Sequence, residues 1–479
     1  MFTNSDNSVK TLSNSEKFEI GFLMKTGVGY EYIKKKYKVS RSYAYGLREY
    51  AEKCLYFLDE HDPYEKTFVL TKDLEKRITV ALGTYCHSSL EGIYFFFKEV
   101  LHTNISTSKA SGILKEAALK AAEWDETIPL NGIKACSSDE IFQNDTPVLV
   151  TIASNINYIC TMEEKEDRKA DTWKSSMEEL KAKGLDLKVS ISDQGTGLLS
   201  GIPKAFPDAE IQYDIFHEEM EFQKHLSKLE DKAFSLIKDE YDLERKAMAA
   251  NGAEKRKLAT KLKAARDKSS RFLRSLDEIR ILFGWLKELF GFSGYSPEEC
   301  MELAKWITSS MGEAAINADM YHFLRIVRGL EQKLPNLLNF VKRLFQDMDV
   351  RAQTMHVPAE AFHRLYHLRT HPSGTQEHRF IEKRAGKLFK GKKEEAKNAL
   401  KAMINETTRA SSMVENTNSH IRPFIDLKRH VPRHFFSLIK VYLNTKEYRR
   451  SVIAERVGKS PYELLTGEKA PRFLDIVCA

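Results

Sequence analysis

The first part of the chain has the residue pattern of short amphipathic helices joined by tight turns. Apolar residues of segment 15–26 recur at near-helical spacing, and Gly27 follows them. A short helix is expected over 30–37, then a turn at Lys38, then a longer helix for which Ser40 is the N-cap. This order is typical of a helix-turn-helix unit, which we assign to residues 1–60.

A second helical unit is expected over residues 61–130. Its helix over 88–101 carries many apolar residues, and a further helix begins where Ser106 or Ser108 can cap it. The segment resembles another helix-turn-helix shape. Two interpretations stay open for it, DNA binding and dimerisation.

The pattern changes to strands at Ile133. Successive strand-like and helical segments follow, and they occupy 133–142, 146–154 and 157–162 (strands), 170–184 (helix), 185–193 (strand), 195–206 (helix) and 210–217 (strand). This order predicts an α/β sheet whose first three strands form a meander.

Almost nothing between Glu218 and Glu406 has a strand pattern. The segment 230–276 predicts a long helical pair broken near Asn251 and Gly252. Because α/β-type sequence stands on both sides of this helical stretch, we interpret it as an insertion. The expected fold is multidomain, with N-terminal all-α helix-turn-helix units and an α/β domain interrupted by an all-α domain. The remaining boundaries are expected at 131–220, 221–405 and 406–479.

Composition adds a clustered positive charge to this picture. The 479 residues carry a formal net charge of only +7, yet the windows 25–48, 379–401 and 422–450 each carry +6. Basic clusters on a nearly balanced chain are typical of a protein that binds a polyanion at several places. The chain has no apolar run long enough for a membrane span and no signal peptide, so we expect a soluble, intracellular protein of the cytoplasm or nucleoid. Six single cysteines favour neither disulfides nor a zinc site.

Two acids are candidates for chemistry on the predicted sheet. Asp193 ends an apolar strand stripe and precedes a Gln-Gly-Thr-Gly turn, as a site at the carboxyl end of a strand would. The alternative is that Asp193 caps the following helix. Asp139 lies on the inward stripe of the first strand, whereas Glu140 is expected on the opposite face. The alternative for Asp139 is a turn that begins after Ser137.

A third acid, Glu415, belongs to a predicted C-terminal helix. Ser412, Glu415, Ser419 and Arg422 fall on one helical stripe, and Pro423 is expected to limit the helix. Three carboxylates from two strands and one helix could hold two divalent cations for phosphoryl transfer. Oxygen-only ligands suit Mg²⁺ or Mn²⁺.

These motifs resemble those of DDE-type transposases with an RNase H-like catalytic domain, in the Mutator-like and hAT-like group with a C/D-x-x-H motif. The stretch SDQGTGLLSGIPKAFPDAEIQYDIFH carries most of the resemblance, together with SSDEIF and MVENTNSHIRP. It implies that Asp139, Asp193 and Glu415 are the catalytic acids and that 221–405 is the helical insertion of such families. The 222 residues between Asp193 and Glu415 leave room for that insertion.

The resemblance also assigns Asp214 and His217 to the C/D-x-x-H motif, although many relatives have Cys where Asp214 stands. His217 would organise the active site or the scissile phosphate, and the alternative is a histidine that packs within the sheet. Some relatives present an aromatic residue from the insertion. We expect Trp285 and Trp306 to be helix-packing residues instead, with base stacking as the alternative.

The basic and polar residues on the predicted DNA-facing elements form the candidate DNA contacts. They are Lys34, Lys35, Lys36, Lys38, Arg41, Ser42, Tyr43 and Arg48 in the first unit, Ser108 and Lys109 in the second, and Lys390, Lys392, Lys393, Arg422, Lys428 and Arg429 beside the Glu415 helix. A solvated helix face is the alternative for each group.

The resulting hypothesis is a transposase that binds double-stranded DNA at terminal inverted repeats, cleaves it with two Mg²⁺ or Mn²⁺ ions and transfers the strand to a target. The resemblance implies a homodimer or larger assembly on DNA. Two other classes stay open, a domesticated inactive DNA-binding regulator and an RNase H-like structure-selective nuclease.

Overall fold

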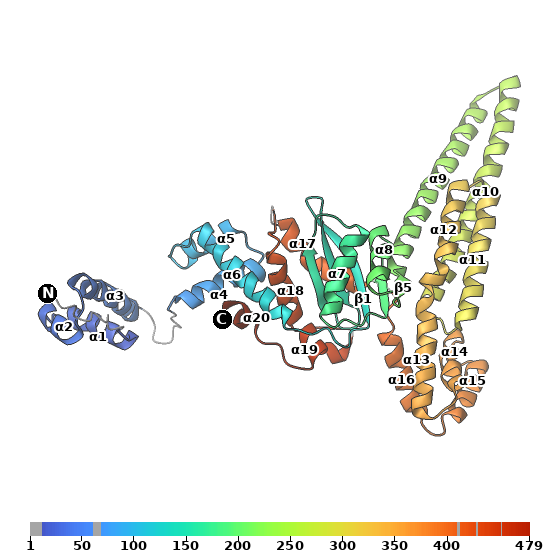
Figure 1. The fold of residues 1–479 in the computed structure, drawn as a ribbon. Helices are drawn as coiled ribbons and strands as arrows, with labels where there is room; N and C mark the ends of the chain where they lie inside the picture. Colours follow the sequence, from blue (N-terminus) through green and yellow to red (C-terminus); the bar gives the residue numbers. More distant parts are fainter. Residues whose placement is uncertain (1–11, 61–68, 410–411, 428–429, 452) are drawn as a thin grey trace. The chain divides into compact units, whose positions relative to one another are not determined.

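The computed structural model describes residues 12–60, 69–409, 412–427, 430–451 and 453–479 (Figure 1). The chain divides into two compact units, Met1–Lys72 and Asp73–Ala479, each described here by itself. Two candidate DNA contacts, Lys428 and Arg429, lie outside the described residues.

The described part of the N-terminal unit contains three helices, α1 (Asn14–Lys25), α2 (Tyr30–Tyr37) and α3 (Arg41–Glu60). The turn after α2 depends on Lys38, whose φ of 54° reverses the chain, and Ser40 Oγ accepts a hydrogen bond from the Tyr43 N–H at 3.3 Å. Gly21 allows α1 and α3 to approach closely, because a Cβ there would lie 2.4 Å from the Leu47 carbonyl oxygen. The predicted helices and the Ser40 cap are confirmed.

The second unit begins with α4 (Lys72–Thr84), α5 (Leu90–Phe95), a π-helical segment η1 (Phe96–Val100) and α6 (Thr107–Glu126). Ser106 caps α6 by accepting a hydrogen bond from the Lys109 N–H at 3.1 Å. Helix α6 packs against C-terminal helices, so the two ends of this unit share one core.

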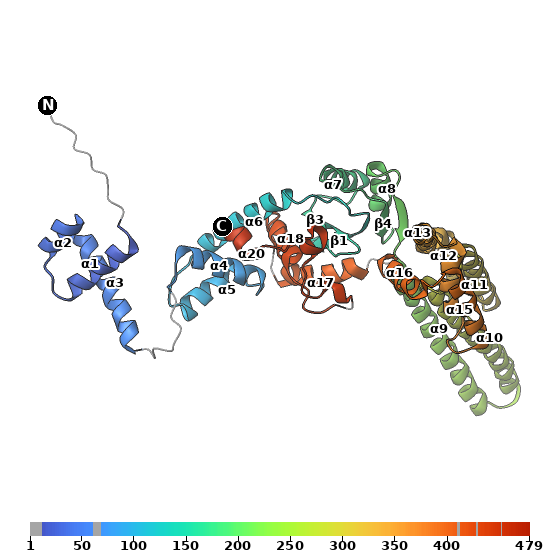
Figure 2. The ribbon, with the colours of Figure 1, turned by 90° about the horizontal axis from the view of Figure 1, so that it is seen from below.

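A mixed five-stranded sheet with strand order β3-β2-β1-β4-β5 follows. Its strands are β1 (Ala135–Gln143), β2 (Thr146–Ala153), β3 (Ile159–Glu164), β4 (Val189–Ser192) and β5 (Glu210–Tyr213). The first three strands pair antiparallel, whereas β4 and β5 are parallel to β1, so the predicted meander is confirmed. Helices α7 (Ala170–Ala182) and α8 (Thr196–Ala205) cover one side of the sheet, and α17 (Ser412–Leu427) covers the other (Figure 2).

An all-helical block separates β5 from α17. It starts with the long antiparallel pair α9 (Ile215–Ala249) and α10 (Gly252–Phe290), which break at Ala250 and Asn251 as predicted (Figure 1). The block continues with α11 (Pro297–Asn317), α12 (Tyr321–Leu337), α13 (Asn339–Met355), α14 (Ala359–His367), the 3₁₀ helix η2 (Leu368–Thr370), α15 (Gln376–Leu388) and α16 (Lys393–Glu406).

The chain then returns to the sheet. After α17 come α18 (Phe435–Thr445), the 3₁₀ helix η3 (Ala454–Arg456), α19 (Pro461–Thr466) and α20 (Phe473–Cys478). The expected combination of helical parts with a small α/β sheet is therefore confirmed. None of the helices among the described residues is long and apolar enough to cross a membrane.

Two predicted ends of secondary-structure elements are wrong. The strand expected over 210–217 ends at Tyr213, because Asp214 is the N-cap of α9 and its Oδ1 accepts a hydrogen bond from the Phe216 N–H at 2.9 Å. Pro423 does not end α17, which continues through it to Leu427.

Candidate functional site

Two of the three predicted acids lie on neighbouring parallel strands. Ser138 of β1 pairs with Ser192 of β4, so Asp139 and Asp193 are the next residues along the two strands. Strand β4 ends there, whereas β1 continues to Gln143. The sheet thus places both carboxylates at the carboxyl end of β4, where open parallel sheets bind ligands.

The Asp193 side chain does not cap α8, whose N-cap is Gly195 and has no side-chain cap. Its Oδ1 accepts a hydrogen bond from the Gly195 N–H at 3.0 Å, which supports the turn before α8. The same carboxylate contributes to an acidic cluster, which consists of Asp139, Glu140 and Asp193. One ligand oxygen from each lies within 4.8 Å of the others.

Glu140 is a member of this cluster that the sequence pattern had set aside. Its carboxylate accepts a hydrogen bond from Trp173 Nε1 of α7 at 3.1 Å, as expected for a side chain on the opposite face from Asp139. It still approaches Asp193, because β4 has ended and no strand covers that edge of β1. A Cβ on Gly195 would lie 3.3 Å from Asp193 Oδ1 and 3.8 Å from Glu140 Oε1, so glycine keeps the gap between them free of side chain.

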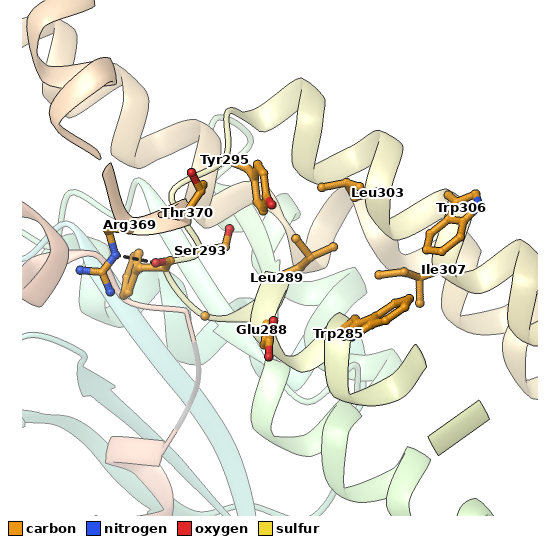
Figure 3. Close-up of a pocket in the computed structure, with 12 residues that line it drawn as sticks. Trp285, Glu288, Leu289, Ser293, Tyr295, Leu303, Trp306, Ile307, Arg369 and Thr370 are labelled. Atoms are coloured by element: carbon orange, nitrogen blue, oxygen red, sulfur yellow. Dashed lines mark hydrogen bonds between the residues drawn. The ribbon is translucent and has the colours of Figure 1, made fainter. Parts of the chain in front are cut away.

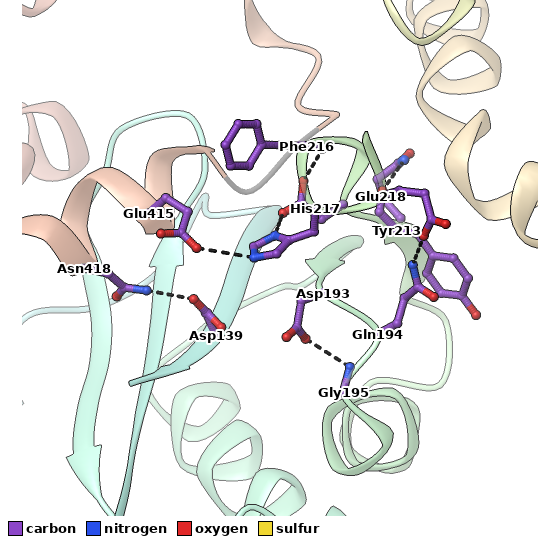
Figure 4. A network of polar contacts seen from close by, with 12 residues as sticks. Asp139, Asp193, Gln194, Gly195, Tyr213, Phe216, His217, Glu218, Glu415 and Asn418 are labelled. Carbon is purple, nitrogen blue, oxygen red and sulfur yellow. Dashed lines mark hydrogen bonds and ion pairs between the residues drawn. The ribbon is translucent and has the colours of Figure 1, made fainter. Parts of the chain in front are cut away.

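The N-terminus of α9 brings the Asp214 and His217 pair to the same place (Figure 4). His217 Nδ1 donates to the fully buried Asp214 carboxylate. This hydrogen bond raises the pKa of His217 to about 9, against the opposing effect of burial, and the charges of Asp214, Asp139 and Glu415 add to it. The protonated imidazole faces Glu415, with Nε2 3.4 Å from Glu415 Oε1.

Helix α17 contributes Glu415 and, one turn later, Asn418. Asn418 Nδ2 donates to Asp139 Oδ2 at 2.7 Å, so the helix that carries the third acid also holds the first. Glu415 itself is not in the 4.8 Å cluster, and its contact through His217 leads to Asp214. Figure 4 shows these groups around one small region. The predicted stripe on α17 omitted Asn418, although its place three residues after Glu415 was the available signal.

The acidic cluster is poorly compensated by positive charge. Burial raises the pKa of Asp139 to about 7, and the Asp193 carboxylate adds to the shift. Burial also raises the pKa of Glu140, whose nearest cation among the described residues is Arg168 at 3.8 Å. Asp139 and Asp193 form no ion pair with Lys or Arg in the part of the chain that the structure describes.

A hard divalent cation fits this set of donors. The cluster offers carboxylate oxygens, and Asn418 Oδ1 nearby is buried without a hydrogen-bond partner among the described residues. Mg²⁺ and Mn²⁺ prefer such oxygen ligands, and a cation would offset the mutual repulsion of the carboxylates.

The candidate DNA contacts of the N-terminal unit lie mostly on its surface. The exposed ones are Lys34, Lys35, Lys36, Lys38, Arg41, Ser42 and Tyr43, while Arg48 is half-buried. Two of the cations have acidic partners, since Lys36 pairs with Glu19 at 3.0 Å and Arg48 with Glu52 at 2.9 Å.

The remaining candidate contacts belong to the second unit. Ser108 and Lys109 are exposed on α6, and Lys109 pairs with Glu75 at 2.5 Å. Lys390 and Lys392 are exposed, whereas Lys393 pairs with Glu382 at 2.8 Å. Arg422 extends toward the site, with Nη2 3.9 Å from Glu415 Oε2.

Trp285 and Trp306 are surface residues and not the packing core that we expected. They are 45% and 53% exposed, and their rings stack at 6.0 Å with an angle of 20°. Both line a cavity of about 810 Å³ in the helical block, shown in Figure 3. This cavity shares no lining residue with the acidic cluster.

Residues 149–282 match the family model described as Transposase, Mutator family. The matched stretch runs from β2 into α10 and includes Asp193, Asp214 and His217, while Asp139 and Glu415 lie outside it. No curated protein matches the chain. The resemblance to Mutator-like transposases is therefore confirmed, and it supports a transposase role with DNA as the substrate.

Proposed function

We propose that the chain is a DDE-type transposase that binds the terminal inverted repeats of its element, cleaves DNA by metal-assisted hydrolysis and transfers the freed strand to target DNA. One observation carries the proposal. Asp139 and Asp193 lie side by side where β4 ends, with Glu140 beside them, and Asp193 belongs to the part of the chain that matches Mutator-family transposases. Carboxylates gathered on adjacent strands are what two-metal phosphoryl transfer requires.

An RNase H-like assignment of the catalytic domain belongs to this proposal. The antiparallel meander, the two parallel strands added beside β1 and the acids on the central strands support it. The helical block between β5 and α17 corresponds to the insertion of such families.

Asp139, Asp193 and Glu140 would hold Mg²⁺ or Mn²⁺, with Glu415 available from α17 for a second ion. Bound divalent cations supply Lewis acidity and lower the pKa of attacking water or a 3′-hydroxyl. The protein's own groups prepare this arrangement. Asn418 orients the Asp139 carboxylate, and the Gly195 N–H orients that of Asp193.

His217 acts as a fixed positive charge in the proposed mechanism. With its pKa raised to about 9, the imidazole is protonated at neutral pH and donates from both nitrogens. Its Nδ1–H is held by Asp214, so its Nε2–H donates to Glu415 or, in place of Glu415, to a phosphate oxygen of the scissile strand, and the ring does not serve as the general base. The hydrogen bond with Asp214 keeps the His217 imidazole protonated and fixes the orientation of its ring.

DNA binding is assigned to the basic surfaces. The N-terminal helices would recognise the end sequence, and the windows 379–401 and 422–450 would hold phosphates beside Glu415. Since two ends are joined in one reaction, the active form is proposed to be a homodimer or a larger assembly.

Asp193→Asn tests the proposal, since it removes one cation ligand with little change in shape. We expect cleavage and strand transfer to fall by at least about a thousandfold, because metal ions contribute several kcal/mol to such transition states. Binding to a labelled terminal repeat should stay unchanged. The matched control is Asp186→Asn, which alters an exposed acid of the same domain that pairs with Lys188.

An assay with a pre-cut labelled DNA end distinguishes a transposase from the other two functional classes. A pre-cut labelled end that is joined to target DNA identifies a transposase, while cleavage without joining identifies a nuclease. End binding without either reaction identifies a regulator. Full activity of the Asp193→Asn variant would contradict the assigned site.

A further inference from the structure

A chain of polar contacts links the turn after β4 to helix α12 of the helical block. Gln194, the residue after Asp193, donates from Nε2 to Glu218 Oε2 at 2.8 Å, as Figure 4 shows. Lys333 of α12 donates from Nζ to both oxygens of the same carboxylate, at 3.1 and 2.9 Å. Glu218 is only 8% exposed, so its buried charge depends on these partners.

The first link of this chain fixes an unusual backbone conformation. Gln194 has a φ of +74°, in the left-handed region that residues with a Cβ rarely adopt. Such a conformation persists where its surroundings hold it. Asp193 precedes Gln194, and its carboxylate is bound by the N–H of Gly195, the residue after Gln194. The direction of the Asp193 carboxylate therefore depends on the Gln194 backbone.

The last link stands on a helix that is docked against the sheet. Gln212 Nε2 of β5 donates to the Leu337 carbonyl oxygen at 3.0 Å, and Asn339 Nδ2 donates to the Ile211 carbonyl oxygen at 3.3 Å. Lys333 lies one turn before Leu337 on α12. Its ammonium group thus reaches Glu218 from a helix end that is fixed beside β5.

We propose that Lys333 is a positioning residue for the acidic cluster. Through Glu218 and Gln194, it holds Asp193 in the orientation that binds divalent cations. The helical block then has a direct part in assembling the site, in addition to any contact with DNA. This inference rests on the proposed role of Asp193 as a metal ligand.

A double-mutant cycle in the full chain tests the inference. Lys333→Met removes the ammonium group, Gln194→Gly removes the other contact while tolerating the positive φ, and the third variant combines them. Calorimetric titration with Mn²⁺ measures the affinity, and joining of a saturating pre-cut end measures the maximal rate. We expect each single variant to lower both quantities about tenfold, as is typical when a partner of a metal ligand is lost.

The combined variant should show the same tenfold loss and not a hundredfold one, because both changes break one chain of contacts. Lys333→Arg should restore most of the affinity and the rate. The matched control is Arg328→Met, which removes an exposed charge from the same helix and should change neither.

Several results would overturn the inference. The first is an unchanged Mn²⁺ affinity in Lys333→Met. The second is a combined variant whose losses of Mn²⁺ affinity and joining rate are the product of those of the single variants. The third is an equal loss of DNA affinity in Lys333→Met and Arg328→Met, which would make Lys333 a phosphate contact. If the wild-type chain binds Mn²⁺ but joins no DNA, the proposed function fails while the Mn²⁺ affinities still decide the role of Lys333. A wild-type chain that binds no Mn²⁺ overturns both.

Discussion

Two buried acidic groups of the second unit differ in how their charge is compensated. The first is the acidic cluster of Asp139, Glu140 and Asp193. The second is the Asp125 network, in which Asp125 of α6 pairs with Lys440 of α18 at 2.8 Å and with Lys183, just after α7, at 3.1 Å. Asp139 and Asp125 are both nearly buried, with exposed fractions of 9% and 7%.

The Asp125 network joins distant parts of the chain. Lys440 also donates to the Cys160 carbonyl oxygen of β3 at 2.6 Å, so one ammonium group connects α18, α6 and the sheet. The side chains of Asp125 and Lys440 are 9% and 10% exposed. Two cations compensate the charge of this buried acid through Oδ2, while Oδ1 has no hydrogen-bond partner among the described residues, and we interpret this network as structural.

The acidic cluster has the opposite character. Its carboxylates face one another, and Asp139 receives only hydrogen bonds from Asn418 and its own neighbour's N–H. Retaining such charges destabilises the protein by itself, because like charges are held together away from water. The comparison shows that charge compensation, and not burial, distinguishes the two groups, and the poorly compensated cluster is the one that we propose binds a cation.

The largest expected effect is a loss of stability when the Asp125 network is broken. Lys440→Met leaves Asp125 buried with only the more exposed Lys183, so we expect the free energy of unfolding to fall by about 3 kcal/mol or more. Urea denaturation followed by tryptophan fluorescence measures it, and the exposed Lys232→Met is the control. A loss below about 0.5 kcal/mol would show that the network is not structural, since surface substitutions have effects of that size.

Asp139→Asn should change the free energy of unfolding in the opposite direction and stabilise the protein. The amide keeps the shape and an acceptor for Asn418 but removes a repelled charge. The pKa rise to about 7 corresponds to at most about 4 kcal/mol, and we expect the metal-free protein to gain about 2 kcal/mol at pH 8. Catalysis should be lost in the same variant. Destabilisation by Asp139→Asn would mean that the carboxylate is compensated after all, which would remove the contrast with Asp125.

The pH dependence sharpens this second prediction. The folded-state pKa of Asp139 is raised, so the folded protein binds more protons and stability should fall as pH rises from about 4 to about 7. His217 contributes stability that is complete below its ordinary pKa and is lost as pH rises through about 9. Asp139→Asn should reduce the first fall, leaving the part due to the raised pKa of Glu140, and should move the second to lower pH, because the Asp139 charge helps to raise the pKa of His217. Urea midpoints in metal-free buffers between pH 4 and 10 separate the two.

The sequence alone identified the two aspartates because their placement is local. Strand alternation and the strand end fix where Asp139 and Asp193 stand, and parallel pairing of β1 with β4 then brings them together. Alternation also predicted that Glu140 points to the opposite face of β1 from Asp139, and its hydrogen bond with Trp173 agrees with that direction. Alternation could not show that the end of β4 lies beside Ser138 of β1 and leaves room there for a longer side chain.

Other parts of the site depend on contacts between distant segments. Asn418 meets Asp139 across 279 residues, and Lys440 meets Asp125 across 315. Hydrophobic periodicity reveals neither contact. A lysine in the apolar helix α18 gives the same sequence pattern whether it is buried or exposed, and only its partner decides which it is. The link from Lys333 to Glu218 is of the same kind.

The smallest expected effect tests how the Asp125 network divides its charge. Lys183→Met removes the second cation, whose side chain is 20% exposed and which also pairs with Glu126 at 2.9 Å. Because Lys440 remains as the closer and more buried partner, we expect a loss of only about 1 kcal/mol, at the upper end of the range for exposed ion pairs. The urea midpoint measures it. A loss equal to that of Lys440→Met would show that the two lysines share the charge of Asp125 equally, so that compensation there depends on total charge and not on one buried contact.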